Sequence, residues 1–391
     1  MTEQSAGARW RSRAAEDTLS EILPQIENAG ITRVSNITGL DTIGLPVVQA
    51  IRPNARSISV SLGKGATVAA AAVSAIMEGY ELYQAEHIRA PLYSASALEL
   101  TKVDLKLFDP LMRRSPDELA PQPLLWVEAT DLITGGPAMV PHDLVSMDFS
   151  HQSQFGNSPF LRSSNGLASG NTEDEAIVHA VCEIIERDAM TLWHFSDDTY
   201  RSSMAIDQTA LPDRLQELLA PIHDGGMQTN LHELTSEIAV PVFACEIGGG
   251  AHEPHRALAG FGCHPDPLWA AERAILEAAQ SRLTMIAGSR DDLLKSQYGG
   301  RIHQTSSVAG TRPFPVSPSE LPSDTNRSRE YLIDRVKRLA LDLIGVEMTG
   351  VFGLPVWRVI IPQLEPPCEL SGYRLREDTL RRLSDSERII S

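Results

Sequence analysis

The chain has 391 residues, enough for one large domain or for two to three average ones. Its formal net charge of −17 argues against nucleic acid as a general partner, because binding to a phosphate backbone requires a basic face. The negative charge does not exclude a nucleotide as ligand, since Mg²⁺ can bridge acidic side chains and phosphates. Because no apolar run has spanning length and the first residues lack the apolar core of a secretion signal, we expect a cytoplasmic protein that binds no membrane.

Strands and helices are expected to alternate along the chain. The first thirty or so residues have the pattern of an amphipathic helix, and two apolar runs around a Gly-Gly turn indicate a hairpin. The elements expected after this first helix are, in chain order, strands 32–37, 47–51 and 56–61, helix 67–86, hairpin 123–145, helix 173–194, strands 237–247 and 257–263, helix 265–285, helix 330–343 and strand 356–361.

This order predicts one compact α/β unit rather than a string of domains. We divide it into an N-terminal helical and strand extension, residues 1–38, and a main domain, residues 39–391. The core motifs occupy 39–292. A stretch rich in Ser, Thr, Pro and Gly, residues 299–327, is the longest irregular segment, and residues 328–391 hold the closing helix, strand and tail.

One sequence pattern occurs three times, at 65–81 (GATVAAAAVSAIMEGYE), at 170–186 (GNTEDEAIVHAVCEIIE) and, more weakly, at 267–280 (PLWAAERAILEAAQ). A single helix of this kind can carry its acidic residues outward into water. Three copies in register instead predict that the same helical face meets at one centre. Two positions of the pattern recur, and we call them the first and the second acidic slot. They hold Glu78 and Glu81 in the first copy, Glu183 and Glu186 in the second, and Glu277 and Gln280 in the third.

Carboxylates gathered in one interior repel each other and require bound cations. Oxygen-only ligands select a hard cation such as Mg²⁺, and the number of carboxylates is enough for two ions. Magnesium in such a setting usually serves phosphates. The second helix adds Glu175 and His179 on the face that carries Glu183 and Glu186. We assign His179 to packing, because the other copies place Ser74 and Arg273 there.

Phosphate also requires donors, and Lys64 lies in a Gly-Lys-Gly turn just before a helix start, where an anion is favoured. The spacing is not that of a P-loop, and a plain loop lysine is the alternative. Arg187 and Arg282 can reach the same rim, with surface ion pairs as the alternative. The segment from Ser164 to Asn171 is either an ordinary turn or a contact to phosphate or ribose.

These motifs resemble the YcaO family over about residues 39–292. The stretches concerned are TGLDTIGLPVVQAIRPNARSISVSLGKGATVAAAAVSAIMEGYE, SNGLASGNTEDEAIVHAVCEIIERDA and AILEAAQSRL. The resemblance implies a YcaO-type domain built from repeated strand–loop–helix units around an ATP and Mg²⁺ site, with Arg187, Gln280 and Arg282 in catalysis. It implies metal ligands at Glu78, Glu81, Glu175, Glu183, Glu186 and Glu277, and nucleotide contacts from Lys64, Ser74, Ser164, Asn171, Arg187 and Gln280.

Members of that family use ATP to activate a backbone amide oxygen, mostly in the biosynthesis of ribosomally made, post-translationally modified peptides such as bacteriocins. Phosphorylation makes that oxygen a feasible leaving group once a nucleophile has added. A Cys, Ser or Thr side chain then gives an azoline and sulfide gives a thioamide, the two products the resemblance favours here. An amine gives an amidine, and by the same logic water cleaves the chain.

The resemblance also implies partners. Azoline-forming members typically end in a P-x-P-x-P tail, whereas this chain ends in SDSERIIS and carries no E1-like domain. We therefore expect a precursor peptide, a separate TfuA-like, E1-like or dehydrogenase-type partner protein, and a homodimer. Two alternatives from other classes are a non-catalytic scaffold and a phosphotransferase that acts on a small metabolite.

Overall fold

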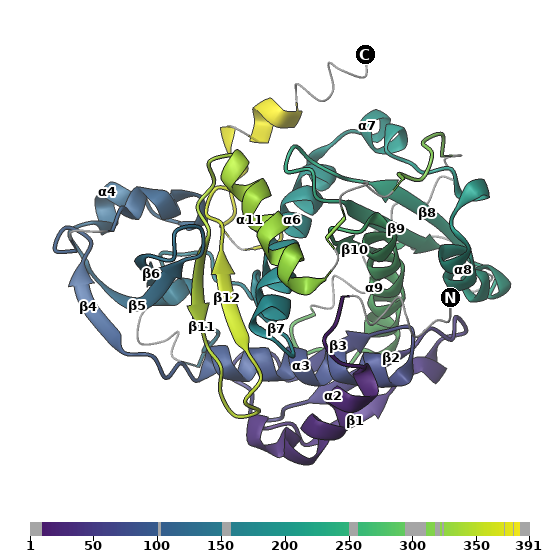
Figure 1. The fold of residues 1–391 in the computed structure, drawn as a ribbon, viewed down its shortest axis with the longest axis horizontal. Coiled ribbons are helices and arrows are strands. Elements are labelled where there is room, and N and C mark those ends of the chain that lie inside the picture. The colour runs from purple at the N-terminus through teal and green to yellow at the C-terminus, as the bar shows by residue number, and fades with distance from the viewer. Residues whose placement is uncertain are drawn as a thin grey trace.

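The computed structural model describes residues 10–100, 103–150, 158–249, 257–293, 310–316, 321–322, 324–370, 372–377 and 379–383. Three units, each a long helix packed on an antiparallel sheet, form the centre of the molecule (Figure 1). In the described part of the chain no helix is long and apolar enough to cross a membrane.

The first unit is a three-stranded sheet with α3 (Val68–Glu86) packed on it. Its strands are, in sheet order, β1 (Arg33–Asn36), β2 (Val47–Ile51) and β3 (Val60–Lys64). Helix and strand approach closely at Gly63, where a Cβ would lie 2.1 Å from the backbone N of Ala75. Glycine is therefore required at that position of β3.

The second unit combines α6 (Glu173–Phe195) with the largest sheet. The helix packs on β7 and β12, and α11 (Thr325–Arg338) lies against it. The strands are, in sheet order, β4 (Leu92–Ser96), β5 (Pro123–Asp131), β11 (Ile344–Glu347), β12 (Val356–Ile360) and β7 (Leu167–Ser169), with β6 (Pro137–Pro141) paired to β5.

The third unit places α9 (Pro267–Ala287) on β9 (Val242–Gly248) and β10 (Leu258–Cys263), with β8 (Gln228–Glu233) at the far edge. Shorter elements surround the three units. They are α2 (Ala15–Ile22), α4 (Pro116–Leu119), α7 (Asp198–Ser203), α8 (Asp213–Asp224) and the 3₁₀ segments η1 (Leu23–Ala29), η2 (Thr38–Leu40), η3 (Leu105–Leu111), η4 (His142–Leu144) and η5 (Gln208–Ala210).

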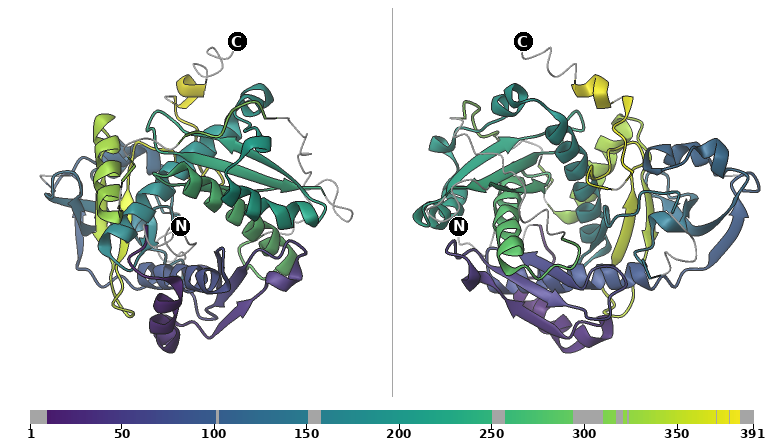
Figure 2. Two further views of the ribbon diagram at one scale, coloured as in Figure 1. Left: turned by 45° about the vertical axis from the view of Figure 1, so that its right-hand side comes forward. Right: turned by 180° about the vertical axis from the view of Figure 1, so that it is seen from behind.

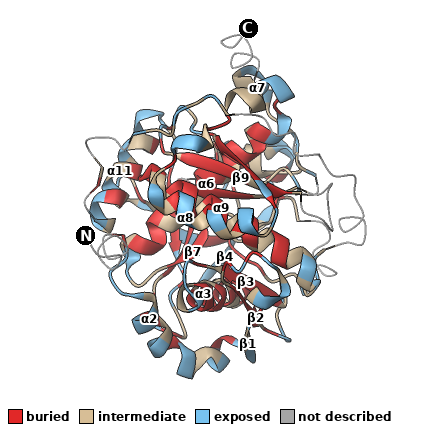
Figure 3. Cartoon of the chain, turned by 90° about the vertical axis from the view of Figure 1, so that its right-hand side faces the viewer, coloured by how far each residue is buried: buried red, intermediate tan, exposed pale blue. Residues whose placement is uncertain are grey.

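The units are joined in a cycle. The helix α3 contacts β7 of the second unit, α6 contacts β10 of the third, and α9 contacts β3 of the first. Figure 2 shows the three helices around the middle of the molecule with their sheets on the outer sides, and Figure 3 shows that the buried residues concentrate in these helices and strands. The same helical face of each unit is therefore directed toward one centre, as the repeat predicts.

The helix starts confirm the register of the repeat. Thr67, Thr172 and Asp266 occupy the same position in the three copies, and each caps its helix. The Thr67 side chain accepts from the N–H of Ala70, and the Thr172 side chain accepts from that of Glu175. Side-chain oxygens at this position satisfy backbone N–H groups that the first helical turn leaves free.

Most expected elements are present, with three corrections. The strand expected at 56–61 lies at 60–64, because Val47 of β2 pairs with Lys64 and this register continues back only to Val60. The helix expected at 330–343 begins at Thr325 and ends at Arg338, and the remaining residues lead into β11. The strand expected at 237–247 begins only at Val242. The strands β4, β7, β8 and β11 and the helices α4, α7 and α8 were not expected, and β7 lies within the loop expected before the second repeat helix.

The irregular segment 299–327 falls mostly outside the described residues. Of it, 310–316, 321–322 and 324–327 are described, and residues 325–327 belong to α11 rather than to a loop. The division between an extension at 1–38 and a main domain at 39–391 stays a prediction.

Candidate functional site

The three Glu residues of the first acidic slot are each bound by a backbone N–H at the inner strand of their own unit. An oxygen of Glu78 accepts from Leu62 at 3.1 Å, one of Glu183 accepts from Gly166 at 3.2 Å, and one of Glu277 accepts from Phe261 at 3.4 Å. Leu62 and Phe261 occupy the same position in their copies of the repeat. Gly166 lies one residue before the matching position of the second copy. The sheets therefore hold the three carboxylates in matching orientations.

The residues of the second slot reach the strand of the next unit. Glu81 accepts hydrogen bonds from the N–H and the hydroxyl of Ser169 in β7 at 2.8 and 2.5 Å. The pKa of the Cys263 thiol in β10 is raised first by burial, next by Cys182 and then by Glu186. Glu186 therefore lies near that strand. The third such residue, Gln280, has a buried Oε1 with no hydrogen-bond partner among the described residues. One acceptor at the centre is thus left unsatisfied.

The five Glu residues of the two slots form a closed cycle of mutual repulsion. Glu78 interacts with Glu277 and Glu81, Glu81 with Glu183, Glu183 with Glu186, and Glu186 with Glu277. We call this set, Glu78, Glu81, Glu183, Glu186 and Glu277, the carboxylate ring. The expected convergence of acidic side chains from three helices is therefore present.

Burial and repulsion disfavour the charged form of most of the ring. Burial is the largest cause in each case. It raises the pKa of Glu78 and Glu186 and raises that of Glu81 well above its usual range. Burial together with Glu186 raises the pKa of Glu183 to about 7, although Arg187 opposes the shift. Groups in this state gain much from a bound cation, because a cation removes the repulsion that raises their pKa.

Glu277 is the exception, because two cations hold it. Burial alone would raise its pKa, but Lys64 and then Arg187 lower it to about 2. The Nζ of Lys64 lies 2.5 Å from one oxygen of Glu277, and Nη1 of Arg187 lies 3.8 Å from the other. Nη1 of Arg187 also lies 3.4 Å from Glu186. Lys64 and Arg187 therefore lie at the carboxylate ring, and their assignment as phosphate donors stays a prediction.

The donor set suits Mg²⁺ that is shared with another ligand. In the described ranges, no three His, Cys, Asp or Glu side chains come close enough to hold a metal ion by themselves. Magnesium is usually bound by one or two carboxylates together with phosphate and water oxygens, not by an all-protein cage. An oxygen-only ring with raised pKa values, an unsatisfied Gln280 oxygen and two adjacent cations fits Mg²⁺ with a phosphate chain.

Glu175 lies apart from this arrangement and is already bonded. Its oxygens accept from the backbone N and Nδ2 of Asn171 at 2.9 and 3.1 Å and from the backbone N of Ser12 at 2.5 Å. Asn171 in turn accepts from Thr18. The three bonds tie the loop before α6 to the N-terminal segment. The assignments of Glu175 to metal and of Asn171 to nucleotide stay predictions.

The remaining predicted site residues are Arg282, Ser74 and Ser164. Arg282 is buried in a paired contact with Asp41, its Nε and Nη2 lying 2.9 and 3.2 Å from the carboxylate. This is the ion-pair alternative, although the pair is buried rather than on the surface, and the assignment of Arg282 to catalysis stays a prediction. Ser74 is half-buried on α3, and Ser164 is exposed just before β7.

Two arginines not predicted as site residues belong to the same region. Arg273 on α9 and Arg11 near the start both lie near His179, where they and above all burial lower its pKa far below the usual value. Burial and then Arg273 lower the pKa of His264 to about 3. Neither arginine forms a hydrogen bond or ion pair with the described residues. Arg273 was detectable as the repeat counterpart of His179, whereas nothing in the sequence marks Arg11.

A model of the YcaO cyclodehydratase family, described as ATP- and Mg²⁺-binding, matches residues 62–365. A protein from the tfuA 3′ region of Rhizobium leguminosarum bv. trifolii is 38% identical over 96% of this chain and 94% of its own length. A protein of Methanothermobacter thermautotrophicus is 32% identical over 89% of this chain and 93% of its own length.

Solved structures confirm the fold. YcaO from Methanopyrus kandleri bound with AMPPCP and Mg²⁺ has a TM-score of 0.70 and 23% identity, with 92% of each chain covered. A heterocyclase in complex with substrate and cofactor has a TM-score of 0.72 and 21% identity over 90% of this chain and 52% of that chain. The Escherichia coli microcin synthetase complex with bound pro-microcin has a TM-score of 0.63 and 14% identity, over 85% of this chain and 88% of that one.

Proposed function

This chain belongs to the YcaO family, and we propose from that premise that it uses ATP and Mg²⁺ to phosphorylate a backbone amide oxygen of a peptide. The observation that carries the proposal is the carboxylate ring with Lys64 and Arg187 bound to Glu277. Acidic groups with raised pKa values next to strong cations match a phosphate chain complexed with metal ions.

The ring carboxylates and the Gln280 oxygen would bind the Mg²⁺ ions, and Lys64 and Arg187 would bind phosphate oxygens. When bound, magnesium ATP supplies the phosphoryl group that turns the amide oxygen into a leaving group. Arg187, whose guanidinium faces two ring carboxylates, would stabilise charge at the transferring group. Glu277, held ionised by Lys64 and Arg187, keeps both cations in position.

Around this centre we propose supporting contacts. Arg11 and Arg273 form a second cationic group beside His179 and extend the positive charge away from the ring. Ser74, Ser164 and Asn171 would contact the nucleotide, and Glu175 would bind metal after releasing its present bonds. Arg282 would position η2 through Asp41 rather than touch the nucleotide.

We propose a thioamide or an azoline as the product and a ribosomally made precursor peptide as the substrate, in a cytoplasmic setting. The relative from a tfuA region supports a separate partner protein of the TfuA type. The microcin synthetase complex among the similar folds supports action within an assembly. A homodimer and a catalytic domain spanning 39–391 complete the proposal.

Two measurements test it. Calorimetric titration with Mg²⁺ and AMPPCP should show binding by the wild-type protein and none by Glu78→Gln. Mass spectrometry of a candidate precursor peptide with ATP, with and without sulfide, distinguishes loss of water, exchange of oxygen for sulfur, and chain scission. ATP consumption that depends on a small metabolite and never on a peptide would overturn the proposal in favour of a metabolite phosphotransferase.

A further inference from the structure

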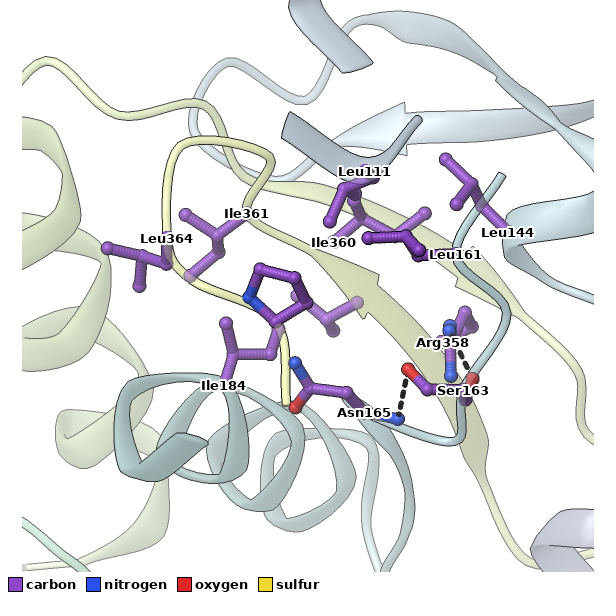
Figure 4. A pocket seen from close by; sticks show the side chains of 12 residues that line it. Leu111, Leu144, Leu161, Ser163, Asn165, Ile184, Arg358, Ile360, Ile361 and Leu364 are labelled. Carbon is purple, nitrogen blue, oxygen red and sulfur yellow. Dashed lines mark hydrogen bonds between the residues drawn. The ribbon is translucent and has the colours of Figure 1, made fainter. Parts of the chain in front are cut away.

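A pocket lies beside the carboxylate ring, between β12, the loop before β7 and α6 (Figure 4). The pocket is partly open to solvent. Most of the residues around it are apolar, but polar atoms form as much of its exposed lining as apolar ones do, which suits a group with an apolar part and a polar part. The apolar walls include Leu111, Leu144, Leu161, Ile184, Leu364 and Pro366.

Two polar side chains in the walls have unsatisfied atoms. Arg358 is 4% exposed, and its Nη2 donates to the carbonyl oxygen of Ser163 at 2.7 Å. Its Nε and Nη1 are buried and have no partner among the described residues, and the same is true of Oδ1 of Asn165. Because an unpaired buried polar group is unfavourable, a ligand that pairs with these atoms removes that cost when it binds.

The pocket is connected to the carboxylate ring through Glu183. Ile184, the next residue on α6, forms part of the pocket wall. Gly166 donates its N–H to Glu183 at 3.2 Å and accepts at its carbonyl from the N–H of Val359, the neighbour of Arg358, at 2.7 Å. Arg358 also attracts Glu183 electrostatically. A group held in the pocket is therefore adjacent to the ring.

The geometry points to a subsite for the peptide substrate, in which an apolar side chain enters the pocket and Arg358 and Asn165 pair with the adjoining peptide group. A peptide group carries one acceptor and one donor, and the pocket provides the complementary donors and acceptor. A free carboxylate would engage only Arg358 and would be repelled by the carboxylate ring. This inference rests on the proposed function, and it adds that the residue beside the activated amide is apolar.

The test uses two minimal peptides, N-acetyl-leucine N′-methylamide and its glycine counterpart, titrated by saturation-transfer NMR. The leucine probe should bind at least about tenfold more tightly, because it alone buries an apolar side chain in the pocket. Arg358→Met should weaken binding of the leucine probe at least about tenfold, because it removes the charged hydrogen-bond donor. Arg338→Met, on the exposed side of α11, is the matched control.

If circular dichroism shows that Arg358→Met does not fold, Leu161→Trp replaces it, since a larger side chain fills the pocket and should abolish binding. Equal affinity for the leucine and glycine probes, or unchanged binding of the leucine probe to a folded variant, would overturn the inference. A parallel titration with Mg²⁺ and AMPPCP separates the two proposals. Failure of nucleotide binding with intact probe binding contradicts the proposed function alone.

Discussion

Ser169 donates both its backbone N–H and its hydroxyl to one oxygen of Glu81, across the boundary between the first and second units. These two bonds oppose the rise that burial causes in the pKa of Glu81. The other oxygen of Glu81 stays available to a cation. The contact therefore both joins two units and orients a ring carboxylate.

Ser169→Ala should hold the Glu81 carboxylate less firmly in its orientation without abolishing metal binding. Loss of one hydrogen bond to a buried carboxylate is expected to cost about 1–3 kcal/mol of stability and to raise the Mg²⁺ concentration needed for half-maximal activity. Thermal unfolding and a magnesium titration measure the two effects. Ser94→Ala, on the exposed edge strand β4, is the control and should change neither. An unchanged magnesium requirement in Ser169→Ala would contradict the role given to the contact.

Glu78→Gln and Glu186→Gln should each abolish ATP turnover while the protein stays folded. Removing a buried charge lowers repulsion within the carboxylate ring, so unfolding in the absence of metal should occur at an equal or higher temperature. Circular dichroism and phosphate release with peptide measure the two properties. Glu27→Gln, at the exposed end of η1, provides the comparison. Wild-type turnover in either ring variant at limiting Mg²⁺ would refute the metal assignment.

In the metal-free protein, Glu183 should contribute a loss of stability as pH rises from about 4.5 to 7, opposite in sign to the contribution of the buried His179 and His264. The pKa of Glu183 is raised to about 7 in the folded state from 4.5, mainly by burial. In that interval this group binds more protons in the folded state than in the unfolded state, so its contribution to the free energy of unfolding falls with increasing pH. Urea unfolding in EDTA at several pH values should show that the stability of Glu183→Gln relative to wild type increases from pH 4.5 to 7. Mg²⁺ with AMPPCP should restore stability at pH 7.

Gly166→Ala should destabilise the junction between β12 and α6. Gly166 has φ +79°, and a Cβ there would lie 2.3 Å from the carbonyl oxygen of Val359. Gly135 has φ +72° with open space around it, so Gly135→Ala tests backbone strain alone. We expect a loss of about 1 kcal/mol for Gly135→Ala and several times that for Gly166→Ala, by chemical denaturation. Equal losses would mean that the close contact carries no cost.

The repeat made much of the site predictable from sequence. Matching positions such as Thr67 and Thr172 predicted equivalent helix starts, and the same register brought Glu78, Glu183 and Glu277 to one centre. Periodicity depends on local chemistry, which a sequence displays directly.

The features that the sequence did not predict depend on contacts between segments that are distant along the chain. The partner of Arg282 is Asp41, which lies 241 residues earlier, and no local pattern connects them. Arg358 on β12 faces the loop before β7 only because β12 pairs with β7 far along the chain. The short strands β8 and β11 were missed because their sequences lack a clear alternation, and sheet pairing decides their conformation.

The cyclic contact of α9 with β3 has a consequence for biosynthesis of the protein. Lys64 and Glu277 are separated by 213 residues, so a ribosome must have released most of the chain before their contact closes the cycle. Until then the first two helices present acidic faces that lack their third neighbour. We therefore expect nucleotide to bind only to nascent chains that already expose α9, and shorter ones to remain unable to retain it.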